Sequence, residues 1–224
     1  LPPGTSGLLS ARPEPDLTVH GYAETEYVVS GRAVSYVAGE RGLAADGHFD
    51  LHEGETSDYV TRVVVRRPAE RSRASGTLVA EWLNVSSGAD TAPDWTFTCD
   101  EILRAGHTWV GVSAQYVGVE GGGGSVAVGD LPPPPGLRGT DAARYGDLRH
   151  PGDAFAYDIF TQAVGAVRDL VAADVVLVVG ESQSAFCLTT YANGVQPLTG
   201  LADAILIHSR GATAAPLGEA GAGL

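Results

Sequence analysis

The segment Val175–Ala185 constrains the fold of this chain more than any other. Its first five residues are an apolar run rich in valine, a pattern typical of a buried parallel strand. Gly180, Glu181 and Ser182 follow at once, and Ser184 stands two places beyond Ser182. Small residues at 180 and 184 allow a strand to turn sharply into a helix and leave the Ser182 hydroxyl at the apex, in a strained backbone conformation.

The composition indicates one globular domain with a proper core. The chain has 224 residues, of which 44% are hydrophobic and 18% charged, and no apolar run long enough to span a membrane. The net charge of −13 argues against binding to nucleic acid or to anionic membrane surfaces. All 14 basic residues are arginine, so chemistry that needs a lysine, such as Schiff-base formation, is excluded.

The chain contains no methionine, which indicates a processed or excerpted sequence. This favours a secreted or extracytoplasmic protein, with a cytoplasmic one as the alternative. Cys99 and Cys187 are too few for a disulfide framework, and we expect two buried free thiols, with a single disulfide as the alternative. No cluster has metal-ligand spacing and no glycine-rich loop has nucleotide spacing, so we expect neither metal nor cofactor.

The pattern of apolar runs and turn residues predicts three regions. Residues 1–20 form a proline-containing extended arm, residues 21–210 an α/β core, and residues 211–224 a flexible Ala/Gly-rich tail. Within the core, residues 118–149 have no regular period, and we interpret them as a flap over a site. Strands are expected in a hairpin over 22–37 broken at Gly31, then over 59–67, 77–83, 108–114, 175–179 and 204–208, with a loop over 39–57. Helices are expected over 94–104, 151–170 and 183–191. This alternation is typical of a mostly parallel sheet covered by helices on both faces.

The helix expected over 151–170 is amphipathic. Its apolar positions Phe155, Ile159, Ala163, Ala166 and Leu170 keep a helical period, which predicts the stripe that faces the sheet. Asp153 lies in its first turn, where an acidic residue stabilises a helix start, so capping is the simplest interpretation of Asp153.

Ser182 is a candidate nucleophile. A hydroxyl at the carboxyl end of a central strand lies where open α/β sheets bind ligands. The same turn directs the backbone N–H of Gln183 and the start of the next helix toward this point, where they can stabilise a tetrahedral oxyanion. A second donor is expected from the loop after an adjacent strand, with Val85 as the donor and Asn84 as a side chain that holds the loop. The alternative is a tight turn with a merely structural serine.

The chain resembles the α/β-hydrolase fold and, more narrowly, the bacterial esterase family of "α/β-hydrolase domain-containing" proteins. The matching blocks are Tyr22–Tyr36, Tyr59–Pro68, Glu81–Ser86, Gly106–Gln115, Arg144–Leu148, His150–Phe160, Gly180–Ser184 and His208–Gly211. The resemblance implies a carboxylic-ester hydrolase that acts on a small-molecule ester with Ser182 as nucleophile. An amidase, thioesterase or acyltransferase on the same fold is an alternative, and so is a non-catalytic binding module.

The residues after Ser182 depart from an active hydrolase, in which an acid and then a histidine follow the nucleophile. The acids there are Asp203 and Glu219, and the histidine is His208. Asp203 and His208 are five apart on one expected strand, so they lie on opposite faces and roughly 16 Å apart. Glu219 follows the histidine, in the wrong order. We therefore expect the last strands of the fold, with the catalytic His and acid, to come from a second polypeptide segment of the same precursor; a fragment is the alternative.

Five further residues are pocket candidates because they adjoin strand ends or the elbow. Gln115 and Tyr116 follow one strand, His208 ends another, His150 precedes a helix, and Glu181 neighbours the nucleophile. For each, a structural role is the competing interpretation.

An arginine cluster offers a different kind of site. Alternation places Arg62 and Arg66 on one face of their strand and Arg67 on the other. An anion site is one interpretation, and a solvated, ion-paired edge is the simpler one.

Overall fold

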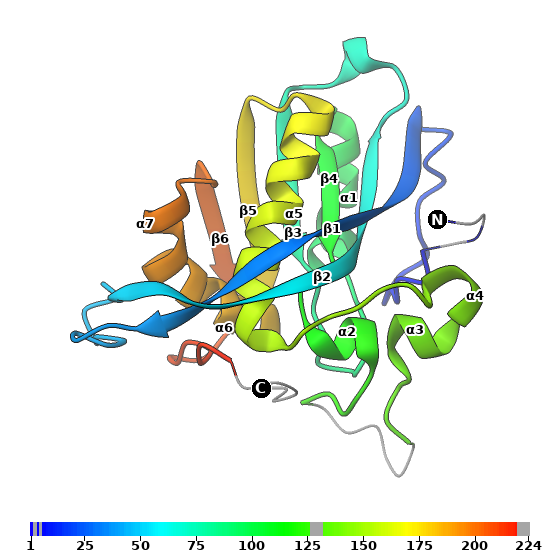
Figure 1. The fold of residues 1–224 in the computed structure, drawn as a ribbon. Coiled ribbons are helices and arrows are strands. Elements are labelled where there is room, and N and C mark those ends of the chain that lie inside the picture. The colour runs from blue at the N-terminus through cyan, green and yellow to red at the C-terminus, as the bar shows by residue number, and fades with distance from the viewer. Residues whose placement is uncertain (2–3, 5, 126–131, 219–224) are drawn as a thin grey trace.

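The protein is built on one six-stranded, mostly parallel sheet. The computed structural model describes residues 1, 4, 6–125 and 132–218. The strands lie in the order β1-β2-β4-β3-β5-β6 (Figure 1). Their bounds are β1 Tyr22–Ala38, β2 Leu51–Pro68, β3 Thr77–Trp82, β4 Thr108–Val112, β5 Val175–Glu181 and β6 Ala204–His208. The pairs of β2 with β1 and β4 are antiparallel, whereas β4, β3, β5 and β6 are mutually parallel.

Helices cover both faces of the sheet, as the sequence predicts. Apolar residues of β2, β3 and β5 alternate between two apolar layers, one against α1 and the other against α5 and α6. The helices are α1 Pro93–Ala105, α2 Tyr116–Glu120, α3 Gly136–Thr140, α4 Ala142–Tyr145, α5 Ala156–Val171, α6 Gln183–Thr190 and α7 Gln196–Thr199. A 3-10 turn over Asp153–Phe155 precedes α5.

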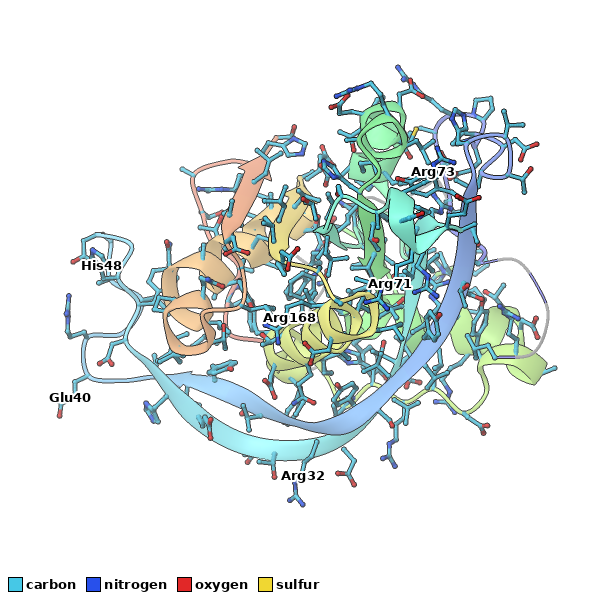
Figure 2. All side chains as sticks on the ribbon, turned by 90° about the horizontal axis from the view of Figure 1, so that it is seen from above. Arg32, Glu40, His48, Arg71, Arg73 and Arg168 are labelled. Carbon is cyan, nitrogen blue, oxygen red and sulfur yellow. The ribbon has the colours of Figure 1, made fainter. Side chains whose placement is uncertain are left out.

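The hairpin predicted within residues 22–37 is wrong. β1 runs through Gly31 without a break, and Gly31 pairs with Tyr59 of β2. The ladder continues to Ala38 opposite Leu51, so residues 51–57 are strand and not loop. A glycine inside a strand is tolerated here because β2 satisfies the backbone on that side. The two strands form a long curved ribbon that carries Arg32 on its outer side and Glu40 and His48 near its far end (Figure 2).

The region 118–149, where the sequence shows no period, contains the end of α2 and the two short helices α3 and α4. Residues 126–131 of the expected flap lie outside the described residues. The helix predicted over 94–104 is confirmed, with Gly106 in the left-handed conformation after its end.

The apolar stripe of α5 differs from the predicted one. Ile159 and Ala163 are fully buried, but Ala166 is exposed and Leu170 is 48% exposed. The later turns bury Val164 and Val167 in the core instead.

Residues 211–218, the described part of the predicted tail, pack back onto the core. Ala215 is buried and its carbonyl accepts a hydrogen bond from the Thr190 hydroxyl. The Tyr157 hydroxyl donates to the Pro216 carbonyl at 2.8 Å. Glu219, one of the two acids that follow Ser182 in the sequence, lies outside the described residues.

Candidate active site

Ser182 lies at the strained turn that the sequence predicts. Its backbone has φ 55° and ψ −112°, between the end of β5 and the first residue of α6. A Cβ added to Gly180 would lie 2.7 Å from Leu188 Cδ1 and 3.2 Å from Ser184 Oγ, so any larger residue would collide with α6. Ser184 itself is fully buried and its hydroxyl donates to the Glu181 carbonyl at 2.9 Å. Both small positions are therefore required by the packing of the elbow.

The loop after β3 is tied to this elbow by two amide side chains. Asn84 Nδ2 donates to the Glu181 carbonyl at 2.9 Å, and Asn84 Oδ1 accepts the Ser86 N–H at 2.8 Å. Gln183 Oε1 accepts the Val85 N–H at 3.2 Å. The loop thus lies beside Ser182, with the Val85 N–H already engaged by the Gln183 side chain.

Gln115, a predicted pocket residue, extends this network. Its Oε1 accepts hydrogen bonds from Gln183 Nε2 at 2.9 Å and from Trp82 Nε1 at 3.1 Å. Gln115 is only 4% exposed. The chain of contacts from Trp82 through Gln115 and Gln183 to Val85 therefore joins the ends of β3 and β4 to the elbow.

His208 lies beside the elbow but is directed to other partners. Its carbonyl accepts the Ser182 N–H at 3.2 Å. Its ring Nε2 lies 2.7 Å from Asp94 Oδ1, and its Nδ1 lies 3.0 Å from Ser209 Oγ. Asp203 lies at the opposite end of β6, where its carboxylate accepts the Val176 N–H. The structure thus keeps Asp203 and His208 apart, as their spacing predicts.

A buried acid that the sequence reasoning missed lies next to this pair. Glu81 is fully buried in β3 and accepts the backbone N–H groups of Asp94 and Trp95 at 2.9 and 2.8 Å, as well as Trp109 Nε1 at 2.9 Å. Burial and then the nearby Asp94 raise the pKa of Glu81. The sequence feature that could have indicated it is a single charged residue within an otherwise apolar predicted strand.

Burial also raises the pKa of Asp94, against the lowering effect of His208. Glu181 is half-buried, and burial likewise raises the pKa of its carboxyl group. Glu81, Asp94 and Glu181 therefore place three carboxyl groups around the α1 side of the elbow.

His150 is held in its neutral form. Its ring Nε2 lies 2.8 Å from the Ala114 carbonyl, so it donates, and Nδ1 accepts the Gly152 N–H at 3.2 Å. Burial lowers the pKa of His150 to about 4. Tyr116 packs edge-on against this ring, and its N–H donates to Asp153 Oδ1 at 2.6 Å. Asp153 therefore accepts from the start of α2. The helix-capping role predicted for it is wrong, because its carboxylate caps neither the 3-10 turn over Asp153–Phe155 nor α5.

The prediction of a solvated arginine edge is wrong for Arg62 and Arg66, which are 0% and 4% exposed. Arg62 pairs with Glu26 at 3.2 Å and with Asp90 at 2.6 Å. Burial is tolerated because these carboxylates come from distant parts of the chain to neutralise the charge.

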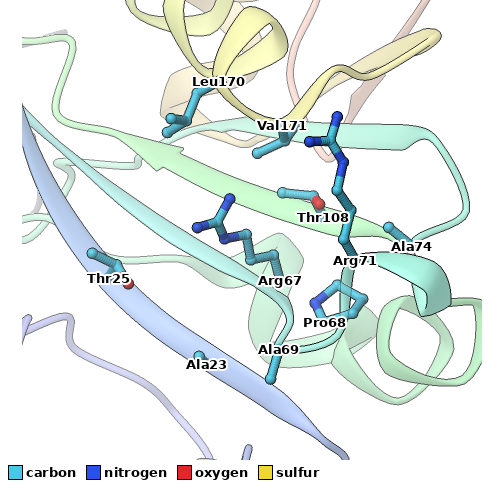
Figure 3. A pocket seen from close by; sticks show the side chains of 10 residues that line it. All are labelled: Ala23, Thr25, Arg67, Pro68, Ala69, Arg71, Ala74, Thr108, Leu170 and Val171. Carbon is cyan, nitrogen blue, oxygen red and sulfur yellow. The ribbon is translucent and has the colours of Figure 1, made fainter.

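Arg67 lies elsewhere, with Arg71, in a groove of about 370 Å³ that also contains Thr108 (Figure 3). This groove is at the amino-terminal ends of the parallel strands, away from Ser182.

Cys99 and Cys187 are both free thiols, and they lie on helices that cover opposite faces of the sheet. Cys187 is buried as expected, but the expectation is wrong for Cys99, which is only partly buried. Within the described ranges, no group of three or more His, Cys, Asp or Glu side chains is arranged to hold a metal ion. Among the same residues, no helix has the length and apolar character needed to cross a bilayer.

The chain belongs to the alpha/beta hydrolase domain family, whose model matches residues 1–224. A search of curated proteins finds no match. Among solved structures, the chain is similar to brefeldin A esterase, described as a bacterial homologue of human hormone sensitive lipase, at 15% identity and a TM-score of 0.39 over 80% of this chain and 39% of that one.

Two further similar structures are esterases. Esterase Est22 is 12% identical, with a TM-score of 0.40, over 83% of this chain and 42% of that one. The glucuronoyl esterase from Solibacter usitatus is 13% identical, with a TM-score of 0.29, over 68% of this chain and 47% of that one. The chain spans less than half the length of each of these three structures.

Proposed function

We propose that this protein is a serine carboxylic-ester hydrolase with Ser182 as its nucleophile. The observation that carries the proposal is the backbone of Ser182, φ 55° and ψ −112°, at the carboxyl end of β5. Such strain costs about 1–3 kcal/mol and persists where function requires it. In this reaction Ser182 Oγ attacks the ester carbonyl, the alcohol leaves with a proton, and water then hydrolyses the acyl-enzyme to the free acid.

The oxyanion donors in this proposal are the backbone N–H groups of Gln183 and Val85. The Gln183 N–H lies at the first helical position of α6, where its donor is free of intrahelical bonding. The Val85 N–H donates to Gln183 Oε1 in the structure, so the tetrahedral oxygen has to replace this side-chain oxygen. Asn84 acts as a positioning residue that keeps the loop against Glu181.

The general base and its acid come, in this proposal, from a further segment of the same precursor. The structure supports this in two ways. Both ring nitrogens of His208 face Asp94 and Ser209. In the part of the chain that the structure describes, β6 pairs with β5 alone, and Leu206 on β6 is 54% exposed. A segment that adds along β6 would cover this edge, which natural proteins rarely leave open.

A fluorophosphonate probe tests the proposal, because it reacts with activated serines. We expect the intact protein to be labelled, Ser182→Ala to lose the label, and the matched control Ser209→Ala to keep it. A denaturing gel and an intact mass of the same sample show whether a second segment accompanies this chain. Absence of label in a sample that contains the complete protein would refute the esterase.

The contact of His208 with Asp94 favours one alternative, a non-catalytic binding module. Labelling of Ser182 by the fluorophosphonate would exclude this alternative, and absence of labelling would support it. An amidase, thioesterase or acyltransferase would also label. These are separated by comparing hydrolysis of matched ester, amide and thioester substrates, where we expect the ester to react fastest.

A further inference from the structure

A small cavity adjoins the elbow on the α5 and α6 face of the sheet. Its volume is about 20 Å³, and its walls include Trp82, Gln115, Asp153, Tyr157 and Cys187. A volume of this size admits a single atom the size of a water oxygen. The cavity can therefore receive one small substituent of a ligand but no chain.

One buried oxygen in its wall has no partner. Asp153 is 7% exposed, and its Oδ1 accepts the Tyr116 N–H at 2.6 Å. Its Oδ2 is buried without a hydrogen-bond partner among the described residues. Burial raises the pKa of this carboxyl group to about 6. An unsatisfied buried acceptor costs about 1–3 kcal/mol, so it signals a group that binds there.

The cavity is connected to the nucleophile through two amide side chains. Gln115 in its wall accepts a hydrogen bond from Gln183 Nε2 at 2.9 Å, and Gln183 follows Ser182 directly. Cys187, also in the wall, lies one helical turn after Gln183, and Gln183 Nε2 is 3.8 Å from its Sγ. Gln183 and Gln115 therefore link the nucleophile to the cavity, and a substituent of a substrate held at Ser182 has to pass these two amides to reach Asp153.

We propose that Asp153 is a specificity-determining residue that accepts a hydrogen bond from a hydroxyl group on the acyl part of the substrate, so that hydroxyacyl esters are preferred. This inference rests on the proposed esterase function. A hydroxyl fits because the cavity admits one heavy atom and its wall offers the polar side chains of Gln115 and Tyr157 beside Asp153. An ammonium group would need further acceptors to replace its water.

A site built to hydrogen-bond a hydroxyl discriminates strongly against analogues without it, because its own polar group is then left unpaired. The test compares kcat/KM for 2-, 3- and 4-hydroxybutyrate p-nitrophenyl esters with that for the butyrate ester. We expect at least one hydroxylated ester to exceed butyrate by about 10-fold or more, as for a hydrogen bond to a charged group.

The decisive variant is Asp153→Asn, which keeps the acceptor for the Tyr116 N–H and the side-chain volume. It replaces the charged acceptor by a neutral N–H donor, from which a hydroxyl can only accept a weaker bond, so the hydroxyl preference should fall about 10-fold or more. An oxobutyrate ester, whose ketone can only accept, should instead be hydrolysed faster by Asp153→Asn than by the unchanged protein. The matched control is Asp158→Asn on α5, whose carboxylate accepts the Val34 N–H at 2.8 Å outside this cavity. This control should leave the ratio of kcat/KM for the hydroxylated ester to kcat/KM for butyrate unchanged.

Two results separate this inference from the function it rests on. If Ser182 is labelled and esters are hydrolysed, but the ratio is the same in wild type and Asp153→Asn, the inference is overturned and the esterase stands. If neither labelling nor hydrolysis occurs, the esterase fails, and calorimetry of hydroxybutyrates and butyrate with Ser182→Ala decides about the site. A hydroxyl preference that Asp153→Asn removes supports the site, and equal binding overturns it.

Discussion

The strain at Ser182 can be measured with a pair of substitutions. Ser182→Ala and Ser182→Gly both remove the hydroxyl, but only alanine keeps a Cβ in a conformation with φ 55° and ψ −112°. At an ordinary position, glycine is the less stable of the two by about 0.5–1 kcal/mol, because it loses more backbone freedom on folding. At position 182 we expect the order to reverse.

The magnitude follows from two terms. A non-glycine residue held in a sparsely populated backbone region costs about 1–3 kcal/mol, which glycine avoids. The entropy of glycine in the unfolded chain offsets part of this gain, by about 0.5–1 kcal/mol. Ser182→Gly should therefore unfold with a free energy about 1 kcal/mol higher than that of Ser182→Ala.

The control position is Ala166, which is exposed in the interior of α5. There Ala166→Gly should cost about 1 kcal/mol, the usual helix propensity difference. Because the unfolded-state term is similar at both positions, the difference between the two alanine-to-glycine comparisons isolates the strain. Urea unfolding, followed by the fluorescence of the buried tryptophans and extrapolated linearly to water, gives each free energy. If glycine is the less stable residue at 182 by as much as at 166, the elbow stores no strain and the argument for Ser182 loses its basis.

Three further predictions concern the buried groups around the site. Arg62→Met should lower the free energy of unfolding by about 3–5 kcal/mol, because it leaves the buried Asp90 carboxylate without its ion pair and removes one of the two arginines that pair with Glu26. Arg104→Met, at the exposed pair with Glu101, should cost less than about 1 kcal/mol. Equal costs of the two variants in urea unfolding would contradict this. The pKa of His150, about 4 in the fold, lies below its usual 6.5, so the unfolded chain binds the proton first. The contribution of His150 to stability should therefore fall as pH drops from 6.5 to 4, by up to about 3 kcal/mol. Burial raises the pKa of Asp153 to about 6, which acts in the opposite direction, so the test is the difference in thermal melts between the unchanged protein and His150→Asn, and a difference that does not vary with pH would contradict the prediction. Gly180→Val should abolish fluorophosphonate labelling and cost about 1–3 kcal/mol through the clash with Leu188; retained labelling would show that the elbow tolerates bulk.

Local sequence patterns were sufficient to predict the class of fold. The valine runs that became β2 and β5, and the periodic segment that became α5, have strong signals that tertiary contacts did not need to override. Gly31 misled because a strand glycine usually marks a break, and its pairing with Tyr59 depends on a partner strand 28 residues away. Such long-range compensation has no local signature.

The site likewise has residues whose positions local sequence patterns predict and residues whose positions depend on distant partners. The position of Ser182 and the proximity of Asn84 and Val85 follow from strand order alone, since adjacent parallel strands end at one edge of the sheet. Arg62 was misplaced because its neutralising partners, Glu26 and Asp90, lie 36 and 28 residues away in the chain. A charge in an alternating strand is exposed by default, and only the folded structure shows that it is buried.

The elbow is held from both faces of the sheet by different chemistry. On the α1 face, Glu81 fixes the start of α1 and Asp94 reaches His208, so ionisable groups connect β3, α1 and β6. On the α5 face, the neutral amides of Gln115 and Gln183 connect β4, the elbow and the loop after β3. Because amides do not titrate, the geometry of the proposed oxyanion donors is independent of pH, whereas the position of His208 depends on the charge of Asp94 and its neighbours. Loss of activity with pH in this protein should therefore arise from the general base of the further segment or from the Asp94–His208 contact, and not from the oxyanion donors.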